Sequence, residues 1–314
     1  MKKKEKLRRL TAAAAAALTL FFSLSVYAQA EDEKSPPLNE AEESETVLPE
    51  PERVEEIESL RQKNSRTYEM SDGSYECVIY AEDVNYEDES GKLVGIDNSL
   101  IADAEYAYKN KANSWNAYFP ESLADEKGLC VKRGDYSLSF SIFSDSAIET
   151  AKEADVFKAK LSENISEAKI TEDTYYEELS KDNRSLVYEN EAVDFAYTVK
   201  TGYLKEDIIL KRHIPGFEVN FLLKLKGIAA EQEESAVIFR NEAGEEVFKM
   251  LPMYMEDAAG NYSEDVHYSL REHEDGYILT VTPDEAFLEE AEYPVKIDPT
   301  VTVTGAGSTS DTCV

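Results

Sequence analysis

The chain has 314 residues, of which 65 are acidic and 33 are basic, and its formal charge is −32. This charge argues against nucleic acid and anionic lipid as partners, because both require Lys and Arg to replace the counterions of their phosphates. The chain contains three cysteines, which excludes a small scaffold held together by disulfides.

The first thirty residues have the features of a secretory signal. Six basic residues precede Leu10, an uncharged Ala-, Leu- and Phe-rich stretch runs to Val26, and Ala28-Gln29-Ala30 matches the small-x-small cleavage pattern. An uncleaved anchor is the alternative, but the apolar run is barely long enough to span a bilayer. We therefore expect residues 1–30 to be removed, and the mature chain to be secreted, extracellular or wall-associated, without membrane contact. Cleavage removes six basic residues and one acid, so the formal charge becomes −37.

The next segment, residues 31–64, is predicted to be a disordered acidic leader. It contains twelve acidic residues and four prolines but few large apolar side chains. Burial of so little apolar surface cannot offset the entropy lost on ordering. Only its end, from Glu52 to Gln62, has apolar residues at helical spacing.

From about Arg66 the apolar residues recur with a period of two, which is typical of half-buried antiparallel strands. The clearest runs are 75–79, 136–142, 193–199, 217–225 and 277–281. Three turns that end in Gly lie between such runs, at 88–91, 241–244 and 257–260. The pattern predicts a mainly β fold, an antiparallel β-sandwich over residues 65–300. Its core is predicted to contain Tyr136, Leu138, Phe140, Phe195, Tyr197, Phe217, Val219 and Phe221.

Two helical interruptions are expected in this β region. Apolar residues from Ile148 to Leu161 have roughly helical spacing, so the acidic region 145–180 is predicted to be a helical connection between two β halves, 65–144 and 181–300. A second, short helix is predicted with Thr282 as N-cap and Pro283 as its first residue. The small, polar residues 301–314 are predicted to be a linker and the start of a following module.

The sequence lacks the usual catalytic motifs: phosphate-binding loops, nucleophile elbows and zinc-protease spacings are all missing. The three histidines have no standard metal spacing, and no cofactor is expected. Carboxylates are too abundant to identify a site. A glycosidase could still be present, because its two carboxylates are defined by their distance in space. A secreted carbohydrate-active enzyme that uses such a pair therefore remains the alternative function.

Two local groups suggest binding hypotheses. Asp257, Asn261 and Asp265 could supply oxygen ligands to calcium, but the loop lacks the EF-hand order, so a plain hairpin turn is the favoured interpretation. Trp115 and Tyr118 could stack on a sugar ring, but a large aromatic ring is more often buried, so we favour a core position for Trp115.

Four segments carry a family resemblance: 63–75, 84–98, Gly202-Tyr203-Leu204-Lys205-Glu206-Asp207-Ile208-Ile209-Leu210 and Tyr293-Pro294-Val295-Lys296-Ile297-Asp298-Pro299-Thr300-Val301. Together they resemble the N-terminal region of secreted, wall-associated Rhs/YD-repeat proteins of Gram-positive bacteria, which precedes their DNRLRE-type modules. Asp311 to Val314 looks like the first strand of such a module, although an aromatic residue is usual at the Cys313 position.

The resemblance implies an exported, non-enzymatic structural or binding module at the front of a longer wall-associated protein. Its expected partner is a cell-wall polysaccharide or another glycan, and not a nucleic acid. The family region has no catalytic residues that could be transferred to this chain.

Overall fold

The computed structural model describes residues 50–143, 159–161 and 183–306, and these residues are mainly antiparallel β-structure. One short α-helix, α2 (Glu285–Glu290), and one 3-10 turn, η1 (Glu58–Leu60), occur among them. The predicted mainly β fold with a short helix is thus confirmed. No helix in the described ranges is both long and apolar enough to cross a bilayer.

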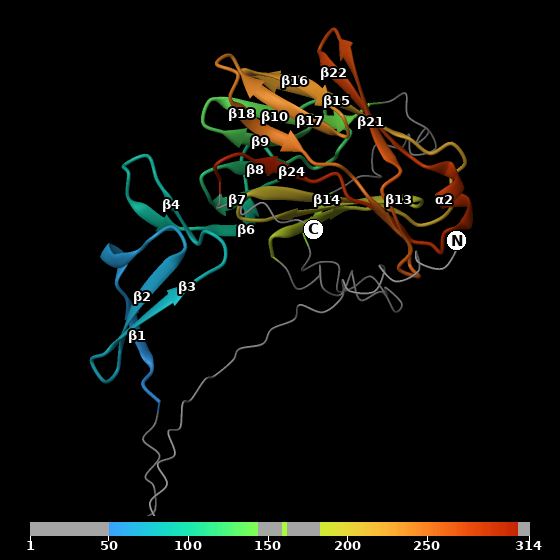
Figure 1. The fold of residues 1–314 in the computed structure, drawn as a ribbon. Coiled ribbons are helices and arrows are strands. Elements are labelled where there is room, and N and C mark those ends of the chain that lie inside the picture. Colours follow the sequence, from blue (N-terminus) through green and yellow to red (C-terminus); the bar gives the residue numbers. More distant parts are fainter. Residues whose placement is uncertain (1–49, 144–158, 162–182, 307–314) are drawn as a thin grey trace, which may run out of the picture. The chain divides into compact units, whose positions relative to one another are not determined.

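The strands form three main sheets (Figure 1). Sheet I has the order β1 (Arg53–Glu56), β2 (Ser65–Met70), β3 (Tyr75–Ile79), and the hairpin of β4 (Asn85–Glu87) and β5 (Leu93–Gly95) follows it. Sheet II has the order β21 (Val266–His273), β22 (Gly276–Pro283), β15 (Val219–Lys226), β10 (Tyr136–Ile142), β9 (Leu129–Arg133), β8 (Asn116–Phe119), β7 (Tyr108–Ala112), β6 (Asp97–Ala102).

Sheet III faces sheet II and is longer. Its order is β11 (Ala159–Leu161), β12 (Ser185–Tyr188), β13 (Val193–Val199), β14 (Tyr203–Leu210), β24 (Val301–Val303), β18 (Glu246–Met250), β17 (Ala236–Asn241), β16 (Ile228–Glu233). The short strands β19 (Met255–Glu256), β20 (Tyr262–Ser263) and β23 (Val295–Ile297) extend it beside β14.

The core lies between sheets II and III, as alternation in the strands requires. The Phe140 ring of sheet II lies 6.3 Å from the Tyr197 ring of sheet III, and Phe195 lies 6.2 Å from Phe221. All eight residues of the predicted core are buried except Tyr136, which is partly buried against the same cluster. The period-two pattern therefore identified the face of these strands that is packed.

The predicted β halves, 65–144 and 181–300, do not form separate sheets. Sheet II takes β6 to β10 from the first half and β15, β21 and β22 from the second. The two halves join where Phe140 of β10 pairs with Leu223 of β15. Alternation reports which face of a strand is buried but not which strand lies beside it.

The region between the halves also differs from the prediction. Ala159–Leu161 lies within the predicted helix but forms strand β11, which pairs with β12. The remainder of 145–180 lies outside the described residues.

The short helix is confirmed but begins two residues later than predicted. Its N-cap is Asp284, whose carboxylate accepts a hydrogen bond from the Phe287 backbone N–H. Pro283 instead ends β22, where it pairs with Val266.

Residues 50–64 of the leader have defined structure, which corrects the prediction that the whole of 31–64 is disordered. The segment Glu52 to Gln62 forms β1 and η1 rather than a helix. Arg53 explains part of this order, because its guanidinium lies 4.6 Å from the centre of the Tyr68 ring and 2.6 Å from the Glu76 carboxylate. The signal segment and residues 31–49 lie outside the described ranges.

The predicted linker begins too early. Val301 to Val303 form β24, which lies between β14 and β18, and the side chains of Val301 and Val303 are fully buried. A three-residue strand gives too short an alternation to be detected in the sequence. Residues 307–314, including Cys313, lie outside the described ranges. The other cysteines do not pair: Cys77 is exposed and Cys130 is buried.

Candidate functional site

Two segments of the family resemblance, residues 202–210 and 293–301, meet at β14. The first segment contains β14 (Tyr203–Leu210), and the second contains its neighbour β23 and the first residue of its other neighbour, β24. Ile208 pairs with Ile297, and Leu204 pairs with Val301. Because consecutive side chains of a strand point to opposite faces, the charged residues of β14 are divided between the two sides of sheet III.

The first side carries a cluster of Lys205, Asp207, Asp298, Tyr254 and Thr300. The Lys205 ammonium lies 2.8 Å from the Asp207 carboxylate and 3.8 Å from that of Asp298. The hydroxyls of Tyr254 and Thr300 donate to the two Asp298 oxygens, at 3.0 and 2.5 Å. Burial lowers the pKa of Lys205, but attraction to the two carboxylates outweighs it and raises the pKa overall. The single ammonium offsets one of the two carboxylates, so the cluster of Lys205, Asp207 and Asp298 keeps one formal negative charge.

The second side places Glu206 inside the core. Its side chain is 1% exposed. It accepts a hydrogen bond of 2.6 Å from the hydroxyl of Tyr197, the residue of β13 with which Glu206 is paired in the sheet. Burial raises the pKa of Glu206 to about 8, although the Tyr197 hydrogen bond acts in the opposite direction. The facing sheet contributes Tyr268, a buried residue whose hydroxyl makes no hydrogen bond with the described residues.

A protonated carboxyl group beside a tyrosine hydroxyl has the composition of an acid–base pair. Catalysis also requires that the pair contact its substrate. Glu206 and Tyr197 are enclosed between two sheets, with Tyr197 0% exposed. In this conformation the pair therefore acts within the core and cannot contact a macromolecule. Its role here is to satisfy a buried carboxyl group.

The calcium candidates do not converge on an open site. The Asp257 carboxylate accepts hydrogen bonds from the backbone N–H groups of Ala259, Asn261 and Glu292 and from the Asn261 amide, at 2.8–3.0 Å. These donors occupy the carboxylate as in an Asx turn, with Gly260 at φ +80°. Asp265 shares a short loop with Ser263, whose hydroxyl accepts its N–H. Within the described ranges, no group of three or more His, Cys, Asp or Glu residues could hold a metal ion.

The two aromatic candidates are separated. Trp115 is 1% exposed and donates from its indole to the Thr201 carbonyl at 2.9 Å, so it belongs to the core, as favoured from the sequence. Tyr118 is half-buried on the outer side of β8, where its ring lies 5.2 Å from the Tyr106 ring. The two side chains do not form a common platform.

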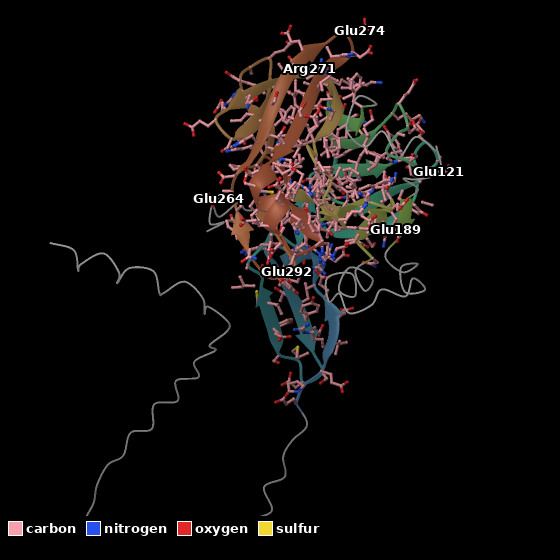
Figure 2. The ribbon with its side chains drawn as sticks, turned by 90° about the vertical axis from the view of Figure 1, so that its right-hand side faces the viewer. Glu121, Glu189, Glu264, Arg271, Glu274 and Glu292 are labelled. Atoms are coloured by element: carbon pink, nitrogen blue, oxygen red, sulfur yellow. The ribbon has the colours of Figure 1, made fainter. Side chains whose placement is uncertain are left out.

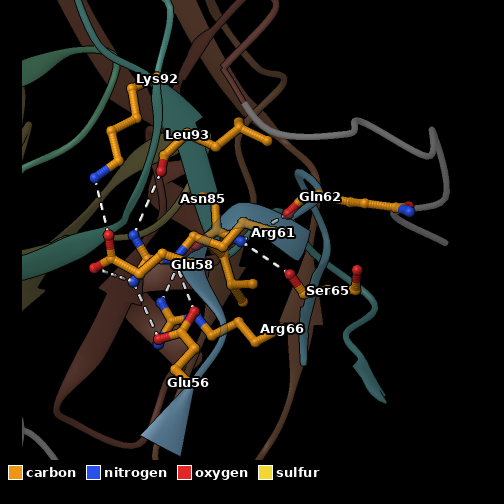
Figure 3. Close-up of polar contacts among 10 residues, drawn as sticks. Glu56, Glu58, Arg61, Gln62, Ser65, Arg66, Asn85, Lys92 and Leu93 are labelled. Carbon is orange, nitrogen blue, oxygen red and sulfur yellow. Dashed lines mark hydrogen bonds and ion pairs between the residues drawn. The ribbon is translucent and has the colours of Figure 1, made fainter. Parts of the chain in front are cut away.

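A surface pocket of about 480 Å³ lies beside η1 and the β4–β5 turn. It is lined by Glu58, Ser59, Arg61, Gly91, Lys92 and Leu93. Arg61 binds Glu56 at 2.7 Å and Lys92 binds Glu58 at 2.9 Å (Figure 3). The opposite charges in this network are paired with one another, so it joins η1 to the hairpin and leaves little net charge for a ligand.

Sequence reasoning missed the Glu206–Tyr197 pair, although a signal was present. Glu206 has the same parity as Leu204 and Ile208, which are both buried, so period-two alternation predicts that it points into the core. Its partner Tyr197 is identified only by the pairing of β13 with β14.

No family model matches the chain, and no solved structure matches it. The chain is 24% identical over 266 residues to the tRNA(Glu)-specific nuclease WapA of Bacillus subtilis subsp. natto and to the tRNA nuclease WapA of Bacillus subtilis strain 168. It is 23% identical over 293 residues to the tRNA3(Ser)-specific nuclease WapA of Bacillus spizizenii.

These relatives contradict three expectations from the sequence: that the function is that of a structural or binding module, that the chain is not an enzyme, and that nucleic acid is not a partner. They are named as enzymes, which opposes the expectation of a non-enzymatic binding module. Their named substrates are tRNAs, which opposes the exclusion of nucleic acid. The exclusion of nucleic acid rested on the net charge, which sums over the whole chain and does not report the charge of any one surface. The similarity covers 81–89% of this chain, which spans only 11–12% of the length of these WapA relatives.

Proposed function

We propose that this chain acts in the cleavage of tRNA, as part of an exported protein of the WapA kind. The observation that carries the proposal is the similarity to three named tRNA nucleases, which extends over at least 81% of the chain. A match of this extent, at 23–24% identity, covers far more of the chain than one shared motif.

The proposal names no catalytic residue in the described region. The Glu206–Tyr197 pair is enclosed in the core, and the Asp257 carboxylate is occupied by hydrogen bonds within the chain. The relatives are about nine times longer than the matched segment, so the activity is proposed for the whole gene product.

Export is the second part of the proposal. The basic, apolar and small-residue segments of residues 1–30 support secretion, and so does the resemblance of residues 202–210 and 293–301 to secreted wall-associated proteins. Mass spectrometry of protein from the culture medium and wall fraction is expected to identify Glu31 as the N-terminal residue. An intact Met1 on cell-associated protein would contradict export with cleavage.

Cleavage is tested by producing the complete gene product without its signal segment inside a bacterial host. Sequencing of RNA ends is expected to show tRNA fragments with defined termini, while messenger and ribosomal RNA remain intact. A Glu206→Gln variant is a useful control, because a buried residue that does not contact RNA should leave the cleavage pattern unchanged. Intact tRNA at protein levels that are confirmed by immunoblot would overturn the proposal.

A further inference from the structure

Five adjacent strands of sheet II have a charge composition unlike that of the chain. β7, β8, β9, β10 and β15 lie side by side. Their charged residues are Lys109, Lys111, Lys132, Arg133, Lys224 and Lys226, with no acidic residue among them. Since acids outnumber bases about two to one in the whole chain, this composition marks the strands as a distinct basic region.

The lysines of these strands share the outer face of the sheet. Phe119, Val131, Leu138 and Leu223 are buried toward the core, so residues of the opposite parity point outward. We call this outer surface the lysine face; it comprises Lys109, Lys111, Lys132, Lys224, Lys226, Tyr118, Asn116, Ser137 and Ser139. Arg133 has the parity of the core residues and is not part of it.

Strand register aligns these side chains in two rows. Lys109 pairs with Tyr118, Tyr118 with Cys130, Cys130 with Ser139, and Ser139 with Lys224. The second row runs from Asn116 to Lys132, Ser137 and Lys226. With strands about 4.8 Å apart, the first row spans about 19 Å between its terminal lysines. A row of this length can contact several consecutive phosphates of a nucleic-acid strand.

Two tyrosine rings lie at one end of the lysine face. The Tyr106 and Tyr118 ring centroids are 5.2 Å apart. The Lys109 ammonium lies 5.9 Å from the Tyr118 ring and that of Lys127 lies 5.6 Å from the Tyr106 ring. Burial, followed by the effect of Cys130, raises the pKa of Tyr106 to about 12, so its hydroxyl remains neutral and adds no negative charge.

Acidic residues border the lysine face but do not neutralise all of it. Asp103 pairs with Lys109 at 3.2 Å, and Asp97 pairs with Lys111 at 2.7 Å. Glu105 and Asp125 lie near Tyr106. Lys132, Lys224 and Lys226 form no ion pair with a described residue. Lys132 and Lys226 both belong to the second row.

Many acids instead occupy connections between elements. Figure 2 labels Glu121, Glu189, Glu264, Glu274 and Glu292, each of which lies just after a strand or after α2. At physiological salt the Debye length is about 8 Å, so charges in distant connections are largely screened from a ligand on the lysine face. The local charge therefore governs binding more than the net charge does.

We propose that the lysine face binds an unpaired segment of RNA. Lysines compensate phosphates, Ser side chains offer hydrogen bonds to the backbone, and the partly exposed rings of Tyr106 and Tyr118 allow bases to stack. This combination is used to bind single strands. A duplex encloses its bases and could use only the lysines. The inference rests on the proposed function for the identity of the RNA as tRNA, but it requires no cleavage by this face.

The test measures the affinity of the full chain, without its signal segment, for a fluorescent unstructured RNA of about 12 nucleotides, for a duplex of equal length and for bulk tRNA. K132E/K226E removes two exposed lysines of one row, neither of which forms an ion pair with a described residue. Its matched control is K63E/K249E, which makes the same charge change away from the lysine face. Lys63 lies just before β2 of sheet I, and Lys249 lies in β18 of sheet III. Thermal unfolding of each variant establishes that the fold is retained.

The unstructured RNA should bind more tightly than the duplex, and K132E/K226E should weaken binding at least tenfold. That variant should also reduce the slope of log affinity against log salt by about 1.4, or about 0.7 per lysine. Tyr118→Leu should weaken single-strand binding by about 5- to 100-fold without altering the salt slope. The control variant should bind within about threefold of the parent.

Equal weakening by the two charge variants would overturn the proposal, because it would indicate nonspecific attraction. Tighter binding of the duplex, no effect of Tyr118→Leu, or no binding at low salt would also overturn it. RNA binding on this face together with uncleaved tRNA in the cellular experiment would overturn only the proposed function. Cleavage of tRNA without binding at the lysine face would overturn only this inference.

Discussion

The position of Glu206 in β14 determines that its carboxyl group is buried, and this burial makes the stability of the fold depend on pH. Its parity in β14 directs it into an apolar core, where the Tyr197 hydroxyl is its hydrogen-bond donor. Removing a carboxylate from water disfavours its charged form, so burial raises the pKa to about 8 from the ordinary 4.5. A side chain that is charged in the unfolded chain is therefore neutral in the folded protein.

This difference predicts that stability falls as pH rises from about 4.5 to 8. The unfolded chain releases the Glu206 proton near pH 4.5, whereas the folded chain retains it until about pH 8. Each unit of pKa difference corresponds to about 1.4 kcal/mol, so the contribution is on the order of a few kcal/mol. It is fully present below pH 4.5 and is lost by pH 8.

Glu206→Gln should keep the hydrogen bond to Tyr197 while removing this dependence. Urea unfolding of parent and variant at pH 5 and pH 8 measures the effect as a difference between the two pH slopes. If the slopes are the same, Glu206 is ionised in the folded protein, and its position in the core needs another explanation.

At the scale of elements, β24 shows that a short segment can be central to a sheet. It connects β14 to β18, with Leu204 pairing with Val301 and Phe248 with Val303. Its residues Val301 and Val303 are fully buried, and Ala306, just beyond it, is 1% exposed. The small, polar residues that follow made the whole segment look like a linker.

Truncation after Thr300 should therefore destabilise the domain by several kcal/mol, because it removes two buried valines and divides sheet III. Truncation after Ala306 is the matched control, since it retains β24. Both forms should be compared with the full chain by denaturant unfolding. Equal midpoints for the chains ending at Thr300 and Ala306 would mean that β24 is dispensable for the sandwich.

At the scale of the whole molecule, stability depends on aromatic contacts between sheets II and III. Phe221 contacts Phe140 of its own sheet with ring centroids 6.0 Å apart, and Phe195 of the opposite sheet at 6.2 Å. Its side chain is 2% exposed. A residue at this junction packs against both layers at once.

Phe221→Ala should lower the free energy of unfolding by about 3–5 kcal/mol, the usual range for a buried Phe that is truncated. Ile79→Ala is the matched control, because Ile79 is 74% exposed and its change should be within about 0.5 kcal/mol. A melting temperature that is unaffected by Phe221→Ala would show that the two sheets do not share this core.

Charge also has to be considered at this scale. A formal charge of −32 led us to exclude nucleic acid, yet the relatives are named for tRNA and five strands of sheet II contain only basic charges. Net charge sums residues whose positions are unknown before folding. A partner instead responds to the charges within about one Debye length of its own.

The sequence by itself determined the mainly β fold, the packed face of the longest strands and the three Gly turns, because these depend on side-chain alternation and local backbone conformation. Only the tertiary structure decided the order of strands, the joining of the two halves in sheet II, the central place of β24 and the pairing of Glu206 with Tyr197. The lysine face belongs to this second group, since its lysines come from three strands spread over residues 109–226. Contacts between residues distant in sequence depend on which strands pair, and no local pattern in a single chain records that choice.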